Sequence, residues 1–490
     1  MCSNYIHFST PQFRLLSDKQ IEELHLATLQ ILERTGVAFD CQEAIDILGE
    51  AGADVSNPKR VKIPSYLVEQ ALRTAPKTIT LYTREGEPAI VLNGMTGSHF
   101  GAGILGSQDY LDPYTRERRT CYVDDIADTA RVVDALPNIE WLYTCGAHST
   151  IPGAIADKVS LLQVILNCSK PVACCTTEAS SLREMLKVCS MVAGGEKELQ
   201  AKPFFIGVSS PTSPLMQGKD DMEKSLLCAE KGIPNIVIST PMAGATAPAT
   251  LPGILATASA ECLSQLVVLQ LKKPGAPVIF GGMPNIIDMK TTIYPYGAPE
   301  LSFLTAALTE VSHYYKLPML GTAGCTDADV VGAQAGVEIT YQILMSALSG
   351  ADLVHDVGVA YHAMMVSPEL IVLADETIDM VKVPMGGLEI NDETLPLDLI
   401  ERVGPGGNYI SEKHTLKHFR KFWVPTIFDR SLVKGEGVKD CEELLNEKTL
   451  KILKTYKPKP LAEGLVKELK KVEGTWFDQV GVEHVYPTRE

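Results

Sequence analysis

Zinc-binding and disulfide patterns are absent from this 490-residue chain. Its twelve cysteines are scattered, and no two of them show the C-x-x-C spacing. No H-x-H or H-E-x-x-H motif occurs, so the sequence offers no ready-made zinc site. We therefore expect no metal centre, and we expect the cysteines to be mostly reduced, buried, small apolar residues.

Positive charge is scarce. Lys and Arg together number 44 against 60 Asp and Glu, which gives a formal net charge of −16. This charge repels phosphate backbones and anionic lipid surfaces, so nucleic acid and membranes are excluded as default partners. No apolar stretch approaches the ~20 residues of a membrane-spanning helix, and residues 1–17 lack a basic segment followed by an apolar one. The sequence predicts a soluble, cytoplasmic protein.

Arginine is missing altogether from residues 184–401. Because arginine is the side chain best suited to a bidentate grip on phosphate, a phosphorylated substrate is disfavoured. No lysine lies on an expected strand, which argues against a Schiff-base aldolase. A G-x-G-x-x-G pattern begins at Gly101, but Asp112 and Pro113 follow it where a dinucleotide site needs a helix.

The chain does contain a repeat of short β-rich runs, turns and amphipathic helical stretches. The strands expected from the sequence are 98–102, 139–146, 171–177, 204–210, 235–241, 277–284, 318–324 and 353–358. Most are continuous apolar runs, which is typical of parallel strands buried on both faces. Alternating strands and helices indicate an α/β fold, and eight consecutive units close most naturally into a (β/α)8 TIM barrel.

Segments of different character flank the expected barrel, which occupies residues 97–382. Residues 1–96 contain helical runs and a hairpin through 78–82 and 88–92, which predicts an N-terminal helical and hairpin cap. Residues 383–490 are expected to form a C-terminal helical extension that includes a Lys-rich helical tail from Cys441 to Val472.

Polar, aromatic and acidic residues gather where the expected strands end, which is where barrel enzymes of this class place their sites. The rings and carboxylates there include Phe100, Tyr294, Tyr296, Tyr361, Asp327, Asp329 and Asp356. Rings beside negative charge suit a cationic ligand, particularly a quaternary ammonium, which donates no hydrogen bond and is held by cation–π contacts. From composition alone, rings at such positions more often serve the packing of the barrel and its helices than the binding of a ligand.

At these residues the sequence resembles the trimethylamine methyltransferase family, over nearly the whole chain. The segments that carry the resemblance are 281–285 with Asp288, 321–329, 334–338, 404–408 and 414–420. The resemblance implies a (β/α)8 enzyme that moves a methyl group from an amine to the Co(I) centre of a separate corrinoid protein. It implies no tightly bound cofactor in this chain, because the partner protein presents the corrinoid, a cobalamin, at the barrel mouth.

One departure from the family pattern is informative. The trimethylamine enzymes carry pyrrolysine in a loop at the barrel mouth, at a position that matches Asp329 within a residue or two. All 490 residues of this chain are ordinary amino acids, so it resembles the branch without pyrrolysine. Members of that branch look like enzymes for quaternary amines, and we expect glycine betaine as methyl donor, with proline betaine or carnitine next. A quaternary nitrogen leaves as a neutral tertiary amine, so no general acid is needed.

On this hypothesis the candidate site residues fall into three groups. The rings expected to hold the cation are Phe100, Tyr294, Tyr296 and Tyr361. The donors expected for a betaine carboxylate are Asn285, His355, Thr326 and Gln334. The carboxylates expected to orient these groups or to favour the cation are Asp327, Asp329 and Asp356. Among all of these, His355, Asp327 and Asp329 are the candidate catalytic residues.

Two alternatives stay open at this point. A cofactor-free barrel lyase or hydrolase acting on a small polar substrate would turn over without any corrinoid. A noncatalytic betaine-binding module would bind its ligand and transfer no methyl group. We also expect the chain to form a homo-oligomer.

Overall fold

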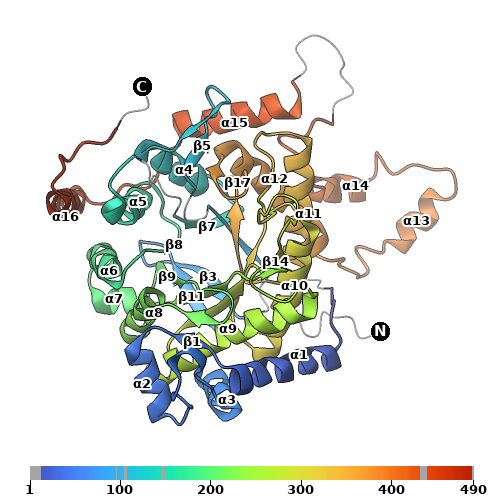
Figure 1. The fold of residues 1–490 in the computed structure, drawn as a ribbon. Helices are drawn as coiled ribbons and strands as arrows, with labels where there is room; N and C mark the ends of the chain where they lie inside the picture. The colour runs from blue at the N-terminus through green and yellow to red at the C-terminus, as the bar shows by residue number, and fades with distance from the viewer. Residues whose placement is uncertain (1–12, 95–96, 104–106, 145–149, 431–438, 488–490) are drawn as a thin grey trace.

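A closed barrel of eight parallel strands forms the centre of the computed structural model, which describes residues 13–94, 97–103, 107–144, 150–430 and 439–487 (Figure 1). In chain order the strands are β4 (His99–Ala102), β7 (Ile139–Tyr143), β8 (Val172–Cys174), β9 (Phe205–Ser209), β11 (Asn235–Ser239), β13 (Val278–Gly282), β15 (Met319–Thr322) and β16 (Leu353–Val357). The last strand, β16, pairs with the first, β4, and closes the barrel. The expected α/β TIM barrel is confirmed, and every strand lies within its expected range.

Helices cover the outside of the barrel (Figure 1). They are α4 (Val123–Ala135), α5 (Gly153–Asn167), α6 (Ala179–Ala193) with the short α7 (Glu196–Ala201), α8 (Lys219–Lys231), α9 (Leu251–Lys272), α10 (Pro299–Tyr315), α11 (Ala333–Ser349) and α12 (Pro368–Met385). We expected no stretch long and apolar enough to span a membrane. This expectation was wrong for α9, whose length and composition would allow it to do so. Because 94% of its most apolar window is buried inside the protein, α9 is a core helix.

The N-terminal segment covers two parts of the barrel. Three helices pack against α9: α1 (Asp18–Gln30, continued by a π-helical turn at Ile31–Thr35), α2 (Gln42–Glu50) and α3 (Ser65–Thr74). The hairpin of β2 (Ile79–Tyr82) and β3 (Pro88–Leu92) contributes fully buried Leu81 and Leu92 to the core inside the barrel. Asp352, just before β16, accepts hydrogen bonds from the backbone N–H groups of Asn93 and Gly94 at 2.7 and 2.6 Å. The hairpin therefore closes the end where the strands begin, and leaves the opposite end as the mouth.

The C-terminal segment differs from its sequence-based prediction. The helical tail expected over 441–472 consists of two helices, α15 (Cys441–Thr455) and α16 (Glu463–Val480), because Pro458 and Pro460 interrupt the helical hydrogen bonding between them. Helix α15 packs against α12 and α4, and α16 packs against α5 and α6. The division of the chain into domains at residues 96 and 382 stays a prediction.

Short strands that the sequence analysis did not predict lie beyond the barrel strands. A four-stranded sheet contains β5 (Asp109–Leu111), β6 (Arg118–Thr120), β17 (Val359–Ala360) and β18 (Met365–Val366). A second small sheet pairs β12 (Met242–Ala243) with β14 (Asn285–Ile286), just after β11 and β13. These additions fix the loops that follow β4, β11, β13 and β16, so they shape the mouth.

The glycine-rich run at the end of β4 has a packing explanation at Gly101. A Cβ atom there would overlap the indole of Trp141. Trp141 is fully buried and donates its Nε1–H to the His99 carbonyl at 3.0 Å. Residues 104–106 of the pattern lie outside the described residues. At Gly101 the missing side chain makes room for a neighbouring ring.

Candidate active site

The mouth of the barrel brings three polar side chains together from different strands. His355 on β16 is fully buried, and its Nε2 lies 2.9 Å from Oγ1 of Thr322 on β15. Tyr143 at the end of β7 meets the imidazole edge-on, with ring centroids 6.0 Å apart. Alternate residues of a barrel strand face inwards, which is why side chains from separate strands meet here.

Asp356 has a buried carboxylate that makes no hydrogen bond to the residues that the structure describes. The residue has a φ of 76°, and it lies at a bulge where the pairing of β16 with β4 shifts register. It is fully buried, and within the described part of the chain neither carboxylate oxygen makes a hydrogen bond. Its Oδ1 is 2.6 Å from Nδ1 of His355, but these neighbouring side chains are not aligned for a hydrogen bond. Since a buried carboxylate without hydrogen bonds is costly, the arrangement favours a positive charge beside Asp356.

Two tyrosines from the segment between β14 and α10 belong to the same interior cluster. The rings of Tyr294 and Tyr296 have centroids 5.0 Å apart, and the Tyr294 hydroxyl donates to the Met283 carbonyl at 2.6 Å. Burial raises the pKa of both tyrosines well above the usual range, and the negative charge of Asp356 raises these pKa values further. The rings therefore stay neutral, and they lie close enough to Asp356 to feel its charge.

Asn285 on β14 connects these tyrosines to the barrel. Its Nδ2 donates to the Pro295 carbonyl at 2.7 Å and so fixes the segment that carries both rings. Its Oδ1 is buried and makes no hydrogen bond to any described residue. The mouth thus contains a second polar group whose hydrogen-bonding capacity is unused.

Asp327, in the loop after β15, ties two other loops together. Its Oδ1 accepts a hydrogen bond from the Tyr296 backbone N–H and lies within 2.8 Å of Nδ1 of His362. Its Oδ2 accepts from the backbone N–H of Gly297 at 2.8 Å. These three contacts fit a role in positioning the loop of Tyr296, and a catalytic role for Asp327 stays a prediction.

Glu338 on α11 holds the loop that carries Asp327, just as Asp327 holds the loop that carries Tyr296. Its Oε2 accepts from the Thr326 hydroxyl at 2.5 Å and from the Asp327 backbone N–H at 2.9 Å. Its Oε1 accepts from Nε2 of the exposed Gln334 at 2.9 Å. Thr326 and Gln334 therefore bind Glu338 in this structure. The sequence analysis assigned no role to Glu338 or His362, although Glu338 lies in a segment that carries the family resemblance.

Phe100 is not brought to the mouth. Its partner in the register between β4 and β16 is Val354, and both residues belong to the core between the strands and the outer helices. Successive side chains of a strand point to opposite faces, so Val354 points outwards while its neighbour Leu353 faces the barrel interior. Phe100 therefore packs away from the barrel interior, and its role in holding the cation stays a prediction that this packing does not favour.

Tyr361 and Asp329 also lie apart from the interior cluster. The Tyr361 ring is covered by the guanidinium of Arg118 on β6, whose Cζ is 3.9 Å from the ring centroid. Asp329 is exposed. The groups that the structure does bring together are Tyr143, Asn285, Tyr294, Tyr296, Thr322, His355 and Asp356, held by Asp327 and Glu338.

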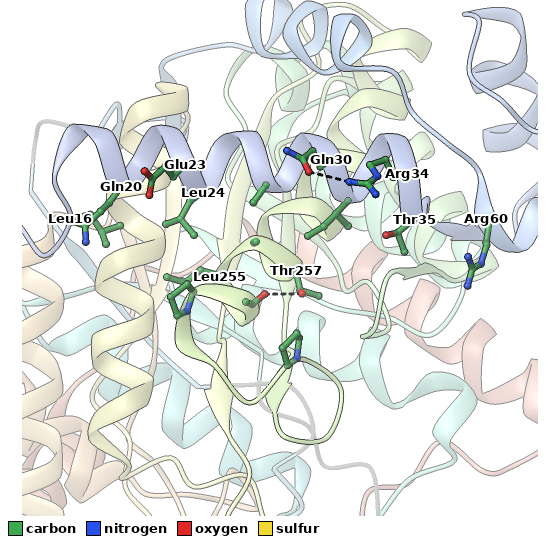
Figure 2. A pocket seen from close by; sticks show the side chains of 16 residues that line it. Leu16, Gln20, Glu23, Leu24, Gln30, Arg34, Thr35, Arg60, Leu255 and Thr257 are labelled. Atoms are coloured by element: carbon green, nitrogen blue, oxygen red, sulfur yellow. Dashed lines mark hydrogen bonds between the residues drawn. The ribbon is translucent and has the colours of Figure 1, made fainter.

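Large surface cavities lie elsewhere on the molecule. A groove of about 850 Å³ separates α1 from the first turns of α9, and Figure 2 shows its mixed lining of Leu16, Leu24 and Leu255 beside Gln20, Glu23 and Arg34. Another cavity of about 950 Å³ lies among α6, α7, α8 and α16. Both are outside the barrel, so the candidate site rests on the chemistry at the strand ends and not on cavity size.

Two cysteines, Cys175 and Cys325, pack in the same interior cluster as the tyrosines of the mouth. Apart from Cys175 and Cys441, which are half-buried, the described cysteines are buried. Within the described ranges, no group of three His, Cys, Asp or Glu side chains is placed to hold a metal ion.

Residues 1–473 match the family described as Trimethylamine methyltransferase (MTTB). The chain belongs to this family. Trimethylamine methyltransferase MttB of Desulfitobacterium hafniense (strain DSM 10664 / DCB-2) is 35% identical over 472 residues, which cover 95% of this chain and 94% of the relative. Glycine betaine methyltransferase of Desulfitobacterium hafniense (strain Y51) is 29% identical over 431 residues, which cover 86% and 88% of the two chains. The protein is therefore a methyltransferase, while the names of the relatives differ in the amine.

Among solved structures, the monomethylamine methyltransferase (MtmB) of Methanosarcina barkeri has a similar fold. It superposes with a TM-score of 0.51 over 96% of this chain and 89% of that chain, at 10% sequence identity. This likeness concerns the fold alone and agrees with the barrel described above.

Proposed function

We propose that this methyltransferase takes a methyl group from a quaternary amine and transfers it to the Co(I) of a corrinoid carried by a separate protein, leaving a tertiary amine. The observation that carries the proposal is the buried carboxylate of Asp356, which accepts no hydrogen bond from any described residue and lies near the neutral rings of Tyr294 and Tyr296. A quaternary ammonium offers no N–H, so a charge and ring faces are what can recognise it. The scattered, mostly buried cysteines fit a reducing compartment, and we propose that the reaction takes place in the cytoplasm.

The chemistry of the transfer needs positioning more than acid–base catalysis. The Co(I) electron pair forms the new Co–C bond, the N–C bond breaks, and its electron pair stays on the nitrogen as a neutral tertiary amine. The corrinoid is a second substrate, so this chain has to hold the N–CH3 axis towards the mouth and exclude water. The absence of pyrrolysine from the sequence supports a quaternary amine over trimethylamine.

Glycine betaine is the substrate that we propose first, with proline betaine or carnitine next. Its ammonium would lie near Asp356, and its own carboxylate must then lie on the far side of the imidazole of His355. Nε2 of His355 and Oγ1 of Thr322 are the groups available there, because Nδ1 of His355 faces Asp356. In this arrangement His355 separates the two negative charges.

An anoxic assay with chemically reduced cobalamin tests the proposal. Glycine betaine, proline betaine, carnitine, choline, dimethylglycine and trimethylamine are added one at a time, and the absorbance change on formation of methyl-Co(III) is followed. Turnover with a quaternary amine supports the proposal, and turnover with trimethylamine alone overturns it. Substrate loss without corrinoid would instead indicate a lyase or hydrolase. Calorimetric binding without methyl transfer would indicate a noncatalytic module.

Replacing Tyr294 separates the role of its ring from the role of its hydroxyl. We expect Tyr294→Leu to lower kcat/KM for the quaternary amine about 30-fold, because a desolvated cation–π contact contributes about 2 kcal/mol. Tyr294→Phe keeps the ring and loses only the bond to the Met283 carbonyl, so it should retain kcat/KM within about fivefold. Steady-state kinetics of both variants give the comparison, and equal losses would show that the ring face does not hold the cation.

A further inference from the structure

An arm formed by residues 386–424 stands out from the barrel. It leaves the end of α12, contains α13 (Leu397–Val403) and α14 (Lys413–His418), and projects away from the body of the molecule (Figure 1). It returns to α12 at Trp423, whose indole N–H donates to Asp379 at 2.8 Å. Neither α13 nor α14 has a buried residue.

Large apolar side chains are exposed along this arm. They are Leu388, Ile390, Leu395, Leu397, Ile400, Tyr409, Ile410, Leu416, Phe419, Phe422 and Val424. Leu388 and Ile410 are 89% and 87% exposed. Scattered apolar residues are normal on a protein surface, but a concentration of this size in one short segment is typical of an interface.

Polar contacts give the arm a defined shape without an apolar core. Arg402 forms a two-pronged ion pair with Glu412, with its closer nitrogen 2.6 Å from a carboxylate oxygen. Lys417 forms an ion pair with Glu393 across the same gap. The arm is therefore an organised element, and its exposed apolar side chains remain available to contact another molecule.

The charges that remain on the arm are self-complementary. Its acidic limb, residues 389–401, carries Glu389, Asp392, Asp398 and Glu401, and its basic limb, residues 413–421, carries Lys413, Arg420 and Lys421. None of these seven forms an ion pair among the described residues. A surface with one acidic and one basic limb matches its own copy when a two-fold axis relates the two, because each acidic limb then faces a basic one.

The base of the arm lies at the end of the barrel opposite the mouth. Helix α12 starts just beyond the mouth and runs back towards the start of the strands. Near its end, Nζ of Lys382 lies 2.8 Å from Oδ1 of Asn138, the residue that precedes β7. A corrinoid protein has to present its cobalt at the mouth, so the arm's position favours a second copy of this chain over that partner.

We propose that the arm packs against the same arm of a second copy, with acidic limb on basic limb and the exposed apolar side chains between them. The proposal is independent of the substrate, so it stands or falls separately from the quaternary-amine assignment. It predicts that the full-length protein sediments as a dimer or a multiple of dimers at micromolar concentration.

The first test removes the apolar contact at positions too exposed to matter for folding of the chain. We expect the double variant Ile390→Asp with Ile410→Asp to raise the dissociation constant at least about 100-fold in analytical ultracentrifugation, since two anchors of over ~1.4 kcal/mol each are lost. The control pair Leu26→Asp with Val485→Asp also alters exposed apolar residues but lies off the arm, and should assemble like the unmodified protein. Unchanged assembly of the arm variant, or a monomeric unmodified protein, overturns the proposal.

A charge-swap experiment tests the two-fold arrangement itself. One variant reverses the acidic limb (Glu389→Lys, Asp398→Lys and Glu401→Lys), and the other reverses the basic limb (Lys413→Glu, Arg420→Glu and Lys421→Glu). Each alone should be monomeric, because like charges face each other, whereas an equal mixture should assemble into mixed dimers. If the mixture stays monomeric while both variants fail to methylate a corrinoid protein, the arm serves that partner and the proposal is wrong.

Discussion

Asp356→Asn should lower kcat/KM for a quaternary amine by about 100-fold or more, while the free energy of unfolding increases. Loss of a buried charge opposite a bound cation costs about 3 kcal/mol, which is a factor of roughly 150 in rate. The unliganded protein, in contrast, loses a buried carboxylate that accepts no hydrogen bond from the described residues. Asn tolerates the left-handed backbone at this position, so the substitution changes charge with little strain. Steady-state kinetics and thermal unfolding of the same preparation measure both effects.

Asp352→Asn is the matched control for this substitution. Asp352 is also buried and lies four residues before Asp356, but its carboxylate accepts backbone N–H groups of Asn93, Gly94 and Met319. Its replacement should destabilise the fold by about 1–3 kcal/mol and leave kcat/KM unchanged below the unfolding temperature. If Asp356→Asn behaved in the same way, Asp356 would be a structural residue and the cation site would lie elsewhere.

The barrel was predictable because parallel strands are buried on both faces and read as short continuous apolar runs. Asn235–Ser239 and Val278–Gly282 are examples in which all residues are buried and the limits match to within two residues at either end. The break between α15 and α16 was missed although Pro458 and Pro460 mark it. The sheet of β5, β6, β17 and β18 could not be predicted, because strands of two or three residues leave no periodic pattern.

The site was predictable in its residue types and less so in its geometry. Two carboxylates near the strand ends, Asp327 and Asp356, look alike in sequence, yet Asp327 makes three polar contacts and Asp356 accepts no hydrogen bond from the described residues. The difference depends on a bulge in β16, which no local pattern announces. Tyr361 was expected to hold a cation from the substrate, but Arg118, far away in sequence, lies over its ring. Contacts between segments that are far apart in the sequence determine both the hydrogen bonding of the two carboxylates and the surroundings of the Tyr361 ring.

Asp327→Ala should lower kcat/KM about 100-fold, mainly through kcat, without removing any group that faces the substrate. The substitution leaves the backbone N–H groups of Tyr296 and Gly297 unpaired and frees the loop of His362. The ring of Tyr296 then loses its fixed position, and misplacement by about 1 Å is enough to cost 100-fold in a reaction that depends on alignment. Hydrogen exchange should increase in residues 294–297, while the strands of the barrel keep their protection.

The exposed neighbour Asp329 provides the comparison for Asp327. Asp329→Ala removes a carboxylate from the same loop, but Asp329 is exposed, so both its kinetics and its exchange pattern should match the unmodified protein. Asp327→Asn should fall between the two, because one amide oxygen can still accept from a single backbone N–H. If Asp329→Ala were as damaging as Asp327→Ala, Asp329 would itself act in the reaction, as its place in the family resemblance first suggested. An ordered series, with Asp329→Ala mildest and Asp327→Ala most severe, assigns the effect to the hydrogen bonds that hold the Tyr296 loop.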